Sequence, residues 1–425
     1  MIAGDSTAKA ERKVVSLLEG MDIHQGPPVN LTFDNELLST HVLFLGGIGS
    51  GKTNAMKHLI RPLRDRAGQD DVFVIFDTKG DFLRTFPRDG DAVISSHPEE
   101  EQGGVVWNLF RDLSSDPVTR EEEIYEIAST IFSDDLKQAG QNMFFASAAR
   151  DIFAAVVQVM ADEDRPHSHE QLRARLEMPA YELQDLLIGD PRLAGPARFL
   201  ENETTANSVL SYLQTALRKS FSGVFGRPGD FSVRDFMRKR GGRALFIEYD
   251  IAAGSSLLPV YRVLIDMAIK EALGLGRERL RTVQPVPDNF FFLMDEFALL
   301  PQLSHMSDGI NFGRELGLKF LVATQNVNQV LHGYSTEIGE SILSGFGTLF
   351  SFRLMDDASR RLVQQRFGAN RKQITTYSPV RNEGVHQIVV SGNVIEDWYM
   401  SGLGRGKCIA LLPGEPPFYF EFKKF

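Results

Sequence analysis

The chain has 425 residues, which is long enough for more than one domain, and its 43% apolar and 24% charged content is ordinary for a soluble globular protein. The net charge of -10 argues against a broad basic surface for nucleic acid, although a narrow channel needs only local Lys and Arg. The single cysteine, Cys408, excludes an intramolecular disulfide, and no Cys/His cluster indicates structural zinc. Cys408 lies in a strand-like run over 407–412, which predicts a buried thiol.

The first 114 residues alternate short apolar runs with helical patterns. Residues 1–40 form a lead-in, for which we expect a helix over 11–18 and a short strand over 29–33. From His41 onward the alternation predicts an α/β fold with a mostly parallel central sheet and helices on both faces. The expected elements of this part are strands over 41–45, 72–76 and 93–94 and a helix over 53–60.

The pattern changes near Ser115. Asp116 and Pro117, with Thr119 and Glu122 as a capping box, predict a helix start. Strand signals are scarce from there on, so residues 115–225 are expected to form an all-helical insertion domain. Its further helices are expected over 143–160, 169–176, 180–187 and 207–219.

No segment reaches the roughly 20 apolar residues of a membrane span. The nearest run, 143–160, is interrupted by Arg150, Asp151 and Gln158 and reads better as a buried helix. The first residues also lack the apolar core of a signal peptide.

The α/β pattern resumes in the last part of the chain. Residues 41–114 and 226–425 are therefore interpreted as two parts of one nucleotide-binding α/β domain that the helical insertion interrupts. Its later elements are expected to be strands over 244–249, 290–294, 320–324 and 348–352 and helices over 258–273 and 307–316.

A phosphate-binding loop is the sharpest motif. Gly46, Gly47, Ile48, Gly49, Ser50, Gly51, Lys52 and Thr53 fit GxxxxGK[ST] at every position, between an expected strand and an expected helix. Such a loop directs backbone N–H groups at phosphates, and the helix N-terminus adds its positive dipole end. Lys52 is expected to meet the β- and γ-phosphates of ATP, and the Thr53 hydroxyl to ligate Mg²⁺.

A second motif adds hydrolysis to nucleotide binding. The run 289–296 is apolar until it ends in Asp295 and Glu296, as in a buried central strand with two acids at its end. Asp295 is expected to hold Mg²⁺ through water, and Glu296 to orient or deprotonate the attacking water. The alternative is a core strand that ends in a solvated acidic turn.

With these elements in place, the chain resembles the coupling proteins of conjugation and type IV secretion, the TraD, TraG and TrwB group. These are RecA-like ATPases, more distantly related to FtsK and HerA. The resemblance covers nearly everything from His41 to the end and depends on several motifs in order. They are the phosphate loop, residues 77–81, 107–110, 144–150, 293–297 with 300–301, 313–317, and 323–326.

The resemblance implies a homo-oligomeric ring, hexameric by analogy, that uses ATP and Mg²⁺ to move DNA. The DNA is expected to be single-stranded or a DNA–protein complex, delivered to a type IV secretion apparatus. The implied partners are a relaxase or other secretion substrate proteins and inner-membrane secretion components. Family members usually carry N-terminal transmembrane helices, which this sequence lacks. Either an anchor was removed or a partner supplies it, so the expected location is the cytoplasm, at the inner face of the membrane.

Three further site candidates follow from the same elements. Gln325 ends an expected strand and is expected to bond the γ-phosphate or attacking water, with a solvent-facing loop glutamine as the alternative. Arg314 is the first candidate, and Arg353 the second, for an arginine that completes a neighbour's site. For Arg314 the alternative is to offset its helix C-terminal dipole. Asp77, Lys79 and Asp81 follow a strand and are expected either near the site or in a surface turn.

Contacts with DNA are harder to predict. The basic candidates, each alternatively a solvated surface charge, are Lys137, Arg150, Arg218, Lys219, Arg238, Lys239 and Arg240. Trp107, Phe144 and Phe145 could stack on bases, but core packing is the favoured interpretation. His167 and His169 lie in a loop and helix start and suggest no metal site.

Two rival functions stay open at this point. One is a HerA-like DNA-processing motor that works without a secretion channel. The other is a platform that recruits secretion substrates and uses nucleotide only to switch state. ATPase activity that rises with DNA favours a motor over a platform, and neighbouring genes for a membrane complex favour a coupling protein over a HerA-like motor.

Overall fold

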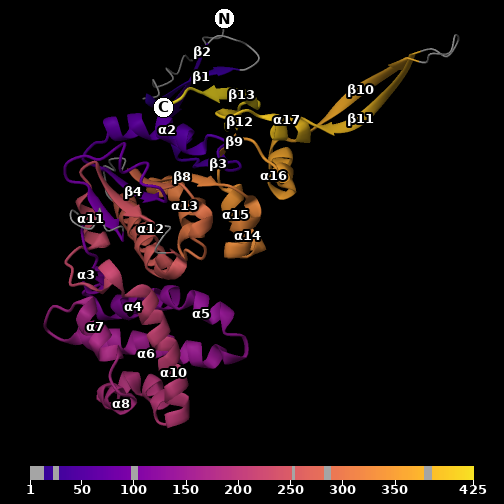
Figure 1. Ribbon diagram of the computed structural model, residues 1–425. Helices are drawn as coiled ribbons and strands as arrows, with labels where there is room; N and C mark the ends of the chain where they lie inside the picture. The colour runs from indigo at the N-terminus through magenta and orange to yellow at the C-terminus, as the bar shows by residue number, and fades with distance from the viewer. Residues whose placement is uncertain (1–13, 23–27, 97–103, 251–253, 282–288, 378–384) are drawn as a thin grey trace, which may run out of the picture. The chain divides into compact units, whose positions relative to one another are not determined.

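The computed structural model describes residues 14–22, 28–96, 104–250, 254–281, 289–377 and 385–425 (Figure 1). The chain divides into two compact units. The first comprises Met1–Ala67, Phe292–Ala298 and Ile310–Phe425, and the second comprises Gly68–Phe291 and Leu299–Gly309. Strand β7 (Asn289–Met294) has residues in both units.

The first unit contains a mixed sheet with the strand order β2-β1-β13-β12-β9-β3-β8-β7. Strand β3 is parallel to both β8 and β9, with Leu43 opposite Val322 and Leu349. These three strands are buried along their whole length. Parallel strands that are covered on both faces carry nearly continuous apolar runs for this reason. The strands are β1 (Val14–Asp22), β2 (Pro28–Asp34), β3 (Val42–Leu45), β8 (Leu318–Thr324), β9 (Thr348–Ser351), β12 (Lys407–Leu411) and β13 (Phe418–Phe422).

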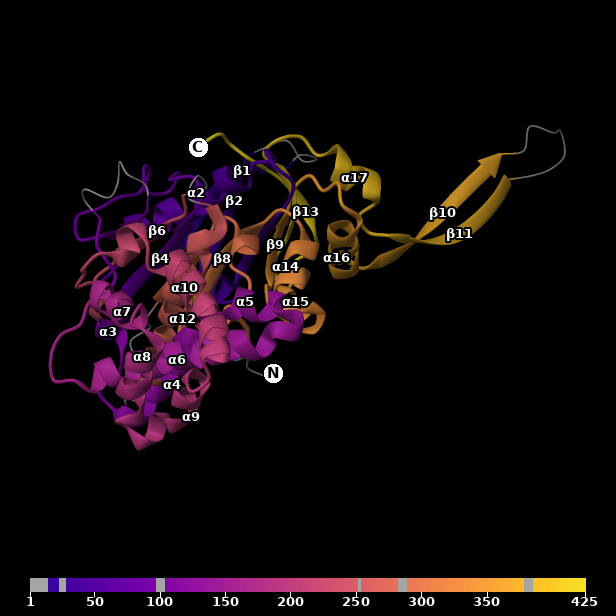
Figure 2. The same cartoon turned by 60° about the horizontal axis from the view of Figure 1, so that its bottom comes forward.

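Helices and a separate hairpin complete the first unit. Strands β10 (Ala369–Tyr377) and β11 (Val385–Asn393) pair with each other in a two-stranded sheet of their own. This ribbon extends beyond α16 and α17 in both views (Figures 1 and 2). The helices are α1 (Asn35–Leu38), α2 (Lys52–Asp65), α13 (Met306–Leu316), which has residues in both units, α14 (Val327–Tyr334), α15 (Thr336–Ser344), α16 (Asp357–Phe367) and α17 (Asp397–Gly402).

The second unit combines parallel strands with the helical segment. Its strand order is β7-β4-β6-β5, and β6 (Arg243–Glu248) is parallel to β4 (Asp71–Asp77) and to β5 (Ala92–Ser95). The long helix α12 packs against α11 and against α4 of the helical segment. The helices outside that segment are α3 (Leu109–Asp112), α11 (Val233–Lys239) and α12 (Leu258–Leu280).

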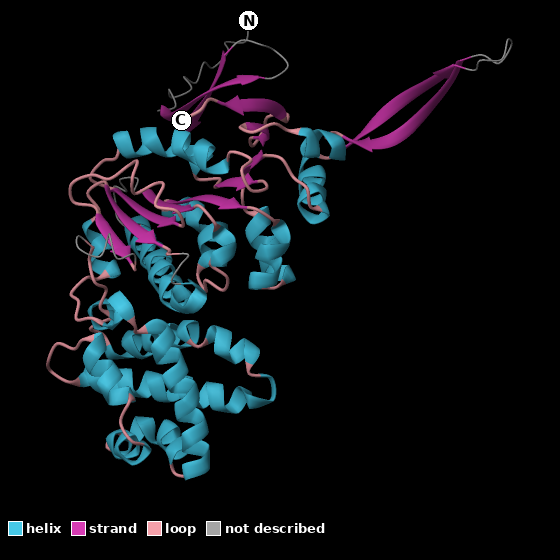
Figure 3. Ribbon diagram, viewed as in Figure 1, coloured by secondary structure: helices cyan, strands magenta, loops and turns pink. Residues whose placement is uncertain are grey.

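From α4 to α10 the chain is built of helices and loops (Figure 3). Its centre is α6, which packs against α4 and α10. Within the described residues, the stretch 140–162 alone is long and apolar enough to cross a membrane, and over half of its apolar window is buried in the unit. The helices are α4 (Pro117–Ile131), α5 (Ser133–Gln138), α6 (Met143–Asp162), α7 (His169–Leu176), α8 (Ala180–Ile188), α9 (Ala194–Ala197) and α10 (Glu203–Ser220).

The α/β fold and the expected strands from residue 41 onward are confirmed, and two local predictions are wrong. The helix predicted over 11–18 is a strand where it is described, since β1 pairs with β2 on one side and β13 on the other. The predicted capping box is absent because Asp116 is the N-cap of α4. Its carboxylate accepts the backbone N–H of Thr119 at 2.9 Å and the Thr119 hydroxyl at 2.7 Å.

Candidate functional site

The phosphate loop connects β3 to α2 in a conformation that requires glycine. Gly51 is the N-cap of α2 with φ 112°, a left-handed backbone that side chains with a Cβ rarely adopt. Gly46 lies so close to β9 that an added Cβ would come within 2.6 Å of the Cβ of Phe352. The loop is also supported from outside the motif, since Gly406 donates its N–H to the carbonyl of Ser50 at 2.8 Å.

The two polar side chains at the start of α2 face the end of β7 and the loop itself. The ammonium of Lys52 is buried and donates to the carbonyls of Gly46 at 2.5 Å and Gly47 at 3.3 Å. The hydroxyl of Thr53 donates to Oδ1 of Asp295 at 3.0 Å. The motif at 46–53 and the acid at 295 are therefore brought together, 242 residues apart in sequence.

Glu296 and Gln325 form the second polar contact of the site. Nε2 of Gln325 donates to Oε2 of Glu296 at 2.6 Å, while Oε1 of Glu296 is buried and accepts no hydrogen bond from the described residues. Burial raises the pKa of Glu296, as does the charge of Asp295, whereas the bond from Gln325 and the charge of Lys52 oppose the rise. The net effect is a raised pKa, as expected for a carboxyl group that exchanges protons with water during a reaction.

The sheet explains why these residues meet. Strands β3, β8 and β7 are neighbours in that order, and Leu45 at the end of β3 lies opposite Thr324 at the end of β8. The phosphate loop and Gln325 therefore follow their strands at the same edge of the sheet. Asp295 and Glu296, which follow β7, lie at this edge too. Ligands in open α/β sheets bind at the carboxyl ends of the strands. All of these residues belong to the first unit.

The two arginine candidates lie on the surface of the same unit. Arg314 is in the last turn of α13, with 58% of its side chain exposed, and its Nη2 is 4.0 Å from Oε1 of Glu36. Arg353 is exposed two residues after β9, and its backbone carbonyl accepts the N–H of Gly47 at 2.9 Å. For Arg314, both an action on another subunit and compensation of the helix dipole are compatible with this position.

Asp77 has a structural role in the second unit. Its carboxylate is fully buried and accepts the backbone N–H groups of the turn that follows β4. Those donors are Lys79 at 3.1 Å, Asp81 at 3.2 Å, Phe82 at 2.7 Å and Leu83 at 3.1 Å. This network favours the interpretation of residues 77–81 as a turn organised by its own acid.

Several DNA-contact candidates are engaged elsewhere. Arg150, Lys219 and Arg238 pair with Asp151 at 2.8 Å, Asp135 at 2.9 Å and Glu271 at 2.6 Å, as in a solvated surface network. Contacts of Lys137, Arg218, Lys239 and Arg240 with DNA stay predictions.

The aromatic candidates differ in exposure. Trp107 is buried and its Nε1 donates to Asp112 at 2.6 Å, so core packing is confirmed for this residue. Phe144 is exposed over about half its surface and packs edge-to-face on Phe199. Cys408 is buried in β12 as predicted, and burial raises the pKa of its thiol.

The sequence reasoning missed the residues that support the site from behind. Gly406 stands before β12, and Phe352 follows β9. Gly406, which directly precedes the apolar run of β12, could have indicated a close backbone approach. No local signal indicated that Gln325 would contact Glu296.

Comparisons with known proteins agree on one family. A family model described as "Type IV secretion-system coupling protein DNA-binding domain" matches residues 29–388. Coupling protein TraD of Escherichia coli (strain K12) is 23% identical over 319 residues, which are 72% of this chain and 41% of that protein. The chain thus spans less than half the length of this curated relative.

Two solved structures of one coupling protein share the fold. The unbound conjugative coupling protein TrwBdeltaN70 has a TM-score of 0.75 at 18% identity, covering 93% of this chain and 87% of that one. TrwB in complex with ADP and Mg²⁺ has a TM-score of 0.73 at 18% identity, with coverages of 93% and 87%.

Proposed function

This chain belongs to the type IV secretion-system coupling protein family, and on this premise we propose that it is a Mg²⁺-dependent ATPase that moves DNA toward a secretion apparatus. The observation that carries the proposal is the meeting of two polar pairs at one sheet edge. Thr53 contacts Asp295, and Gln325 contacts Glu296. The first pair suits a metal-bound phosphate and the second a water molecule.

The residues present fit Mg²⁺ and ATP. The hydroxyl of Thr53 and the carboxylate of Asp295 are oxygen donors, which Mg²⁺ prefers. Among the described residues, no group of three or more His, Cys, Asp or Glu side chains could hold a metal alone. A site of this kind binds Mg²⁺ together with nucleotide phosphates.

Each side chain then has a defined task. Thr53 and Asp295 would hold Mg²⁺, which would supply positive charge to offset the charge that develops on the phosphates during transfer. Lys52 exchanges its bonds to the loop carbonyls for the phosphates, which are stronger, charge-assisted acceptors. Glu296 offers its unpaired Oε1 to the attacking water, while Gln325 fixes the other oxygen.

The wider function rests on the relatives. TraD and TrwB are named as coupling proteins, and TrwB is described in complex with ADP and Mg²⁺. We extend to this chain a homo-oligomeric, hexameric ring, single-stranded DNA as cargo, and a relaxase and inner-membrane secretion components as partners. We also propose that it works at the cytoplasmic face of the membrane. Residues 115–225 are proposed as a helical insertion domain within the nucleotide-binding domain.

The test is steady-state ATP hydrolysis with and without Mg²⁺ and single-stranded DNA. We expect Mg²⁺-dependent hydrolysis that DNA stimulates, and expect Lys52→Ala to lose it while circular dichroism and the thermal midpoint stay near those of the parent. Lys57→Ala, a partly exposed lysine outside the motif in the same helix α2, is the matched control. Hydrolysis that DNA does not stimulate would favour the recruitment platform, and unchanged turnover in Lys52→Ala would contradict the site.

A further inference from the structure

A short segment connects the two residues that the proposed mechanism uses most. Residues 297–305 follow Glu296 directly and lead into α13, which carries Arg314. The segment begins with one turn of 3₁₀ helix, Phe297–Leu299. Residues 299–309 belong to the second unit, whereas the chain before and after them belongs to the first. What holds this segment in the second unit therefore constrains both of its ends through the chain.

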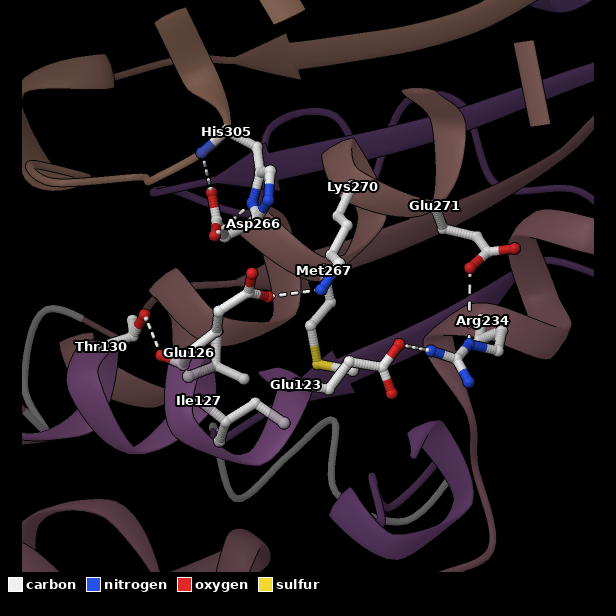
Figure 4. Close-up of a pocket in the computed structure, with 11 residues that line it drawn as sticks. Glu123, Glu126, Ile127, Thr130, Arg234, Asp266, Met267, Lys270, Glu271 and His305 are labelled. Carbon is white, nitrogen blue, oxygen red and sulfur yellow. Dashed lines mark hydrogen bonds and ion pairs between the residues drawn. The ribbon is translucent and has the colours of Figure 1, made fainter. Parts of the chain in front are cut away.

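Asp266 of α12 holds the segment with both carboxylate oxygens (Figure 4). Oδ1 accepts the backbone N–H of His305 at 2.8 Å, and Oδ2 lies 2.9 Å from Nδ1 of the same histidine. The carboxylate is buried, and charge-assisted bonds of this kind are about twice as strong as neutral ones. Two bonds from one residue fix both the position and the orientation of His305.

The backbone of the segment is strained, which makes the anchor necessary. Gln302 has φ 65°, in the left-handed region that is unfavourable for a residue with a Cβ. Such a conformation persists only where the surroundings enforce it. In the sequence, buried Leu300 precedes Gln302, and buried Leu303 and Met306 follow it. His305, which Asp266 holds, lies between Leu303 and Met306.

The anchor lies in a charged cavity beside the helical segment. The cavity has a volume of about 50 Å³ and is lined by residues of α4, α11, α12 and the loop before α13 (Figure 4). On one side Lys270 of α12 pairs with Glu126 of α4, and on the other Arg234 pairs with Glu123 of α4. Helix α4 is consequently tied to the same face of α12 that holds His305.

These charges also set the protonation of the histidine. Burial lowers the pKa of His305, but the hydrogen bond and charge of Asp266 and the charge of Glu126 raise it by more, against the charge of Lys270. The net shift is upward, which keeps the imidazolium paired with Asp266 to a higher pH than for a free histidine.

We infer that Asp266 and His305 are a positioning pair that fixes the segment joining Glu296 to Arg314, so that α12, and α4 beside it, set the rate of ATP hydrolysis. The inference rests on the proposed ATPase function. Neither residue touches the nucleotide site. The pair therefore acts on turnover, through the placement of Glu296, and not on nucleotide affinity.

The test compares Asp266→Ala, His305→Ala and the double variant in DNA-stimulated ATP hydrolysis, with exposed His332→Ala as the control. We expect kcat to fall roughly 10- to 100-fold in each single variant, in line with the effect of small misplacements of catalytic groups. KM for ATP should stay within about twofold. The double variant should lose no more than either single one, because the pair acts as a unit.

Asp266→Asn is the conservative variant, since its carbonyl oxygen still accepts the N–H of His305. We expect it to recover much of kcat, and to lose the decline of activity that the parent shows as the pH rises through the pKa of His305. Hydrogen exchange at the His305 amide reads the anchor without any ATPase, and should be faster in Asp266→Ala.

Three results would overturn the inference. They are a kcat within twofold of the parent in folded single variants, losses that multiply in the double variant, or no difference between Asp266→Asn and Asp266→Ala. A parent that hydrolyses no ATP would instead contradict the proposed function, and unchanged exchange at His305 would contradict the anchor itself.

Discussion

Two histidines outside the proposed chemistry, His41 and His169, are buried and hydrogen-bonded to the backbone through both ring nitrogens. Nε2 of His41 lies 3.1 Å from the carbonyl of Ile310, and its Nδ1 accepts the N–H of Phe320 at 3.2 Å. His169 lies in the other unit, with Nδ1 2.8 Å from the carbonyl of Phe225 and Nε2 accepting from Leu109. Desolvation lowers the pKa of both histidines to about 4.

Acid should therefore begin to destabilise both units at pH values well above those at which carboxylates titrate. Above pH 6.5 each histidine is neutral in the folded and unfolded states, and its full contribution is present. As the pH falls from 6.5 toward 4, the unfolded chain takes up protons first, so stability is lost. We expect a loss of about 2 kcal/mol per histidine at pH 5.

Urea unfolding at pH 7.5 and pH 5 measures this loss. His169→Asn should be less stable than the parent at pH 7.5 but should lose less stability on acidification, while exposed His332→Asn should follow the parent. Equal pH dependence in the parent and in His169→Asn would contradict the assignment.

Gln325 is expected to act through Glu296. Removing the bond in Gln325→Ala leaves burial to raise the pKa of Glu296 further. Because Glu296 works as a carboxylate, activity is lost as pH falls through its pKa, so the acid limb of kcat should move to higher pH. At neutral pH we expect roughly tenfold lower kcat, the value of one charged hydrogen bond.

The pH profile of kcat tests this, with exposed Gln329→Ala as the control. A Gln325→Ala variant that loses ATP affinity while keeping the acid limb of the parent would instead indicate direct contact with nucleotide.

At residue scale, the sequence was enough to find those site residues that belong to short local motifs. The loop at 46–53 and the acids after β7 are short motifs whose strand context fixes their place, so the contact of Thr53 with Asp295 followed from the sheet edge. Contacts such as Gln325 with Glu296 and Asp266 with His305 depend on how two distant segments pack. Neither residue type nor spacing encodes that packing.

Among the secondary-structure elements, the parallel strands were predictable because their apolar runs are continuous, as in 42–45 and 320–324. Helix α10, with Asn202 as its N-cap, begins four residues before its predicted start. The strand β1 was mistaken for a helix because its pairing is not visible locally: besides β2, it pairs with β13, which lies at the other end of the chain. The hairpin β10–β11 was missed although Ile374-Thr375-Thr376 and Ile388-Val389-Val390 are β-branched runs on either side of a segment that contains Pro and Gly.

The hairpin should be dispensable for the stability of the first unit. Its two strands form a sheet of their own, and Ile374 and Ile388, which lie opposite each other, are both about half exposed. A lone two-stranded ribbon adds little to the fold it projects from. Replacing residues 370–392 with a short Gly-Ser linker should leave the thermal midpoint within about 2 °C and ATP affinity unchanged.

Calorimetry and nucleotide titration check this expectation, with the double change Ile374→Thr and Ile388→Thr as the variant that keeps the ribbon. A large drop in the thermal midpoint for the linker variant alone would show that the strands support the unit.

For the whole molecule, the family is established, while assembly is a proposal whose key residue is Arg314. Its exposed guanidinium faces Glu36 at 4.0 Å. An arginine that acts on a neighbour contributes about 10³–10⁵ in rate in GTPase systems, whereas one that offsets a helix dipole contributes only about 0.3–1 kcal/mol of stability. Arg314→Ala should keep its thermal stability and ATP affinity but lose most DNA-stimulated hydrolysis.

Mixing Arg314→Ala with Glu296→Gln should restore part of the activity, since mixed rings contain interfaces where an intact Glu296 meets an intact Arg314. Arg353→Ala serves as the comparison for the second candidate. If mixed rings are shown to form and no activity returns, Arg314 does not act on a neighbouring subunit.

The most direct test of the ATPase proposal is the behaviour of Glu296→Gln in a single-turnover assay. The substitution keeps the hydrogen-bond partner of Gln325 and leaves Thr53 and Asp295 intact, so it removes only the charge that activates water. We predict ATP and Mg²⁺ binding within about twofold of the parent, and hydrolysis slowed by a factor of at least about 10². A variant that binds ATP and hydrolyses it near the parent rate would contradict the account.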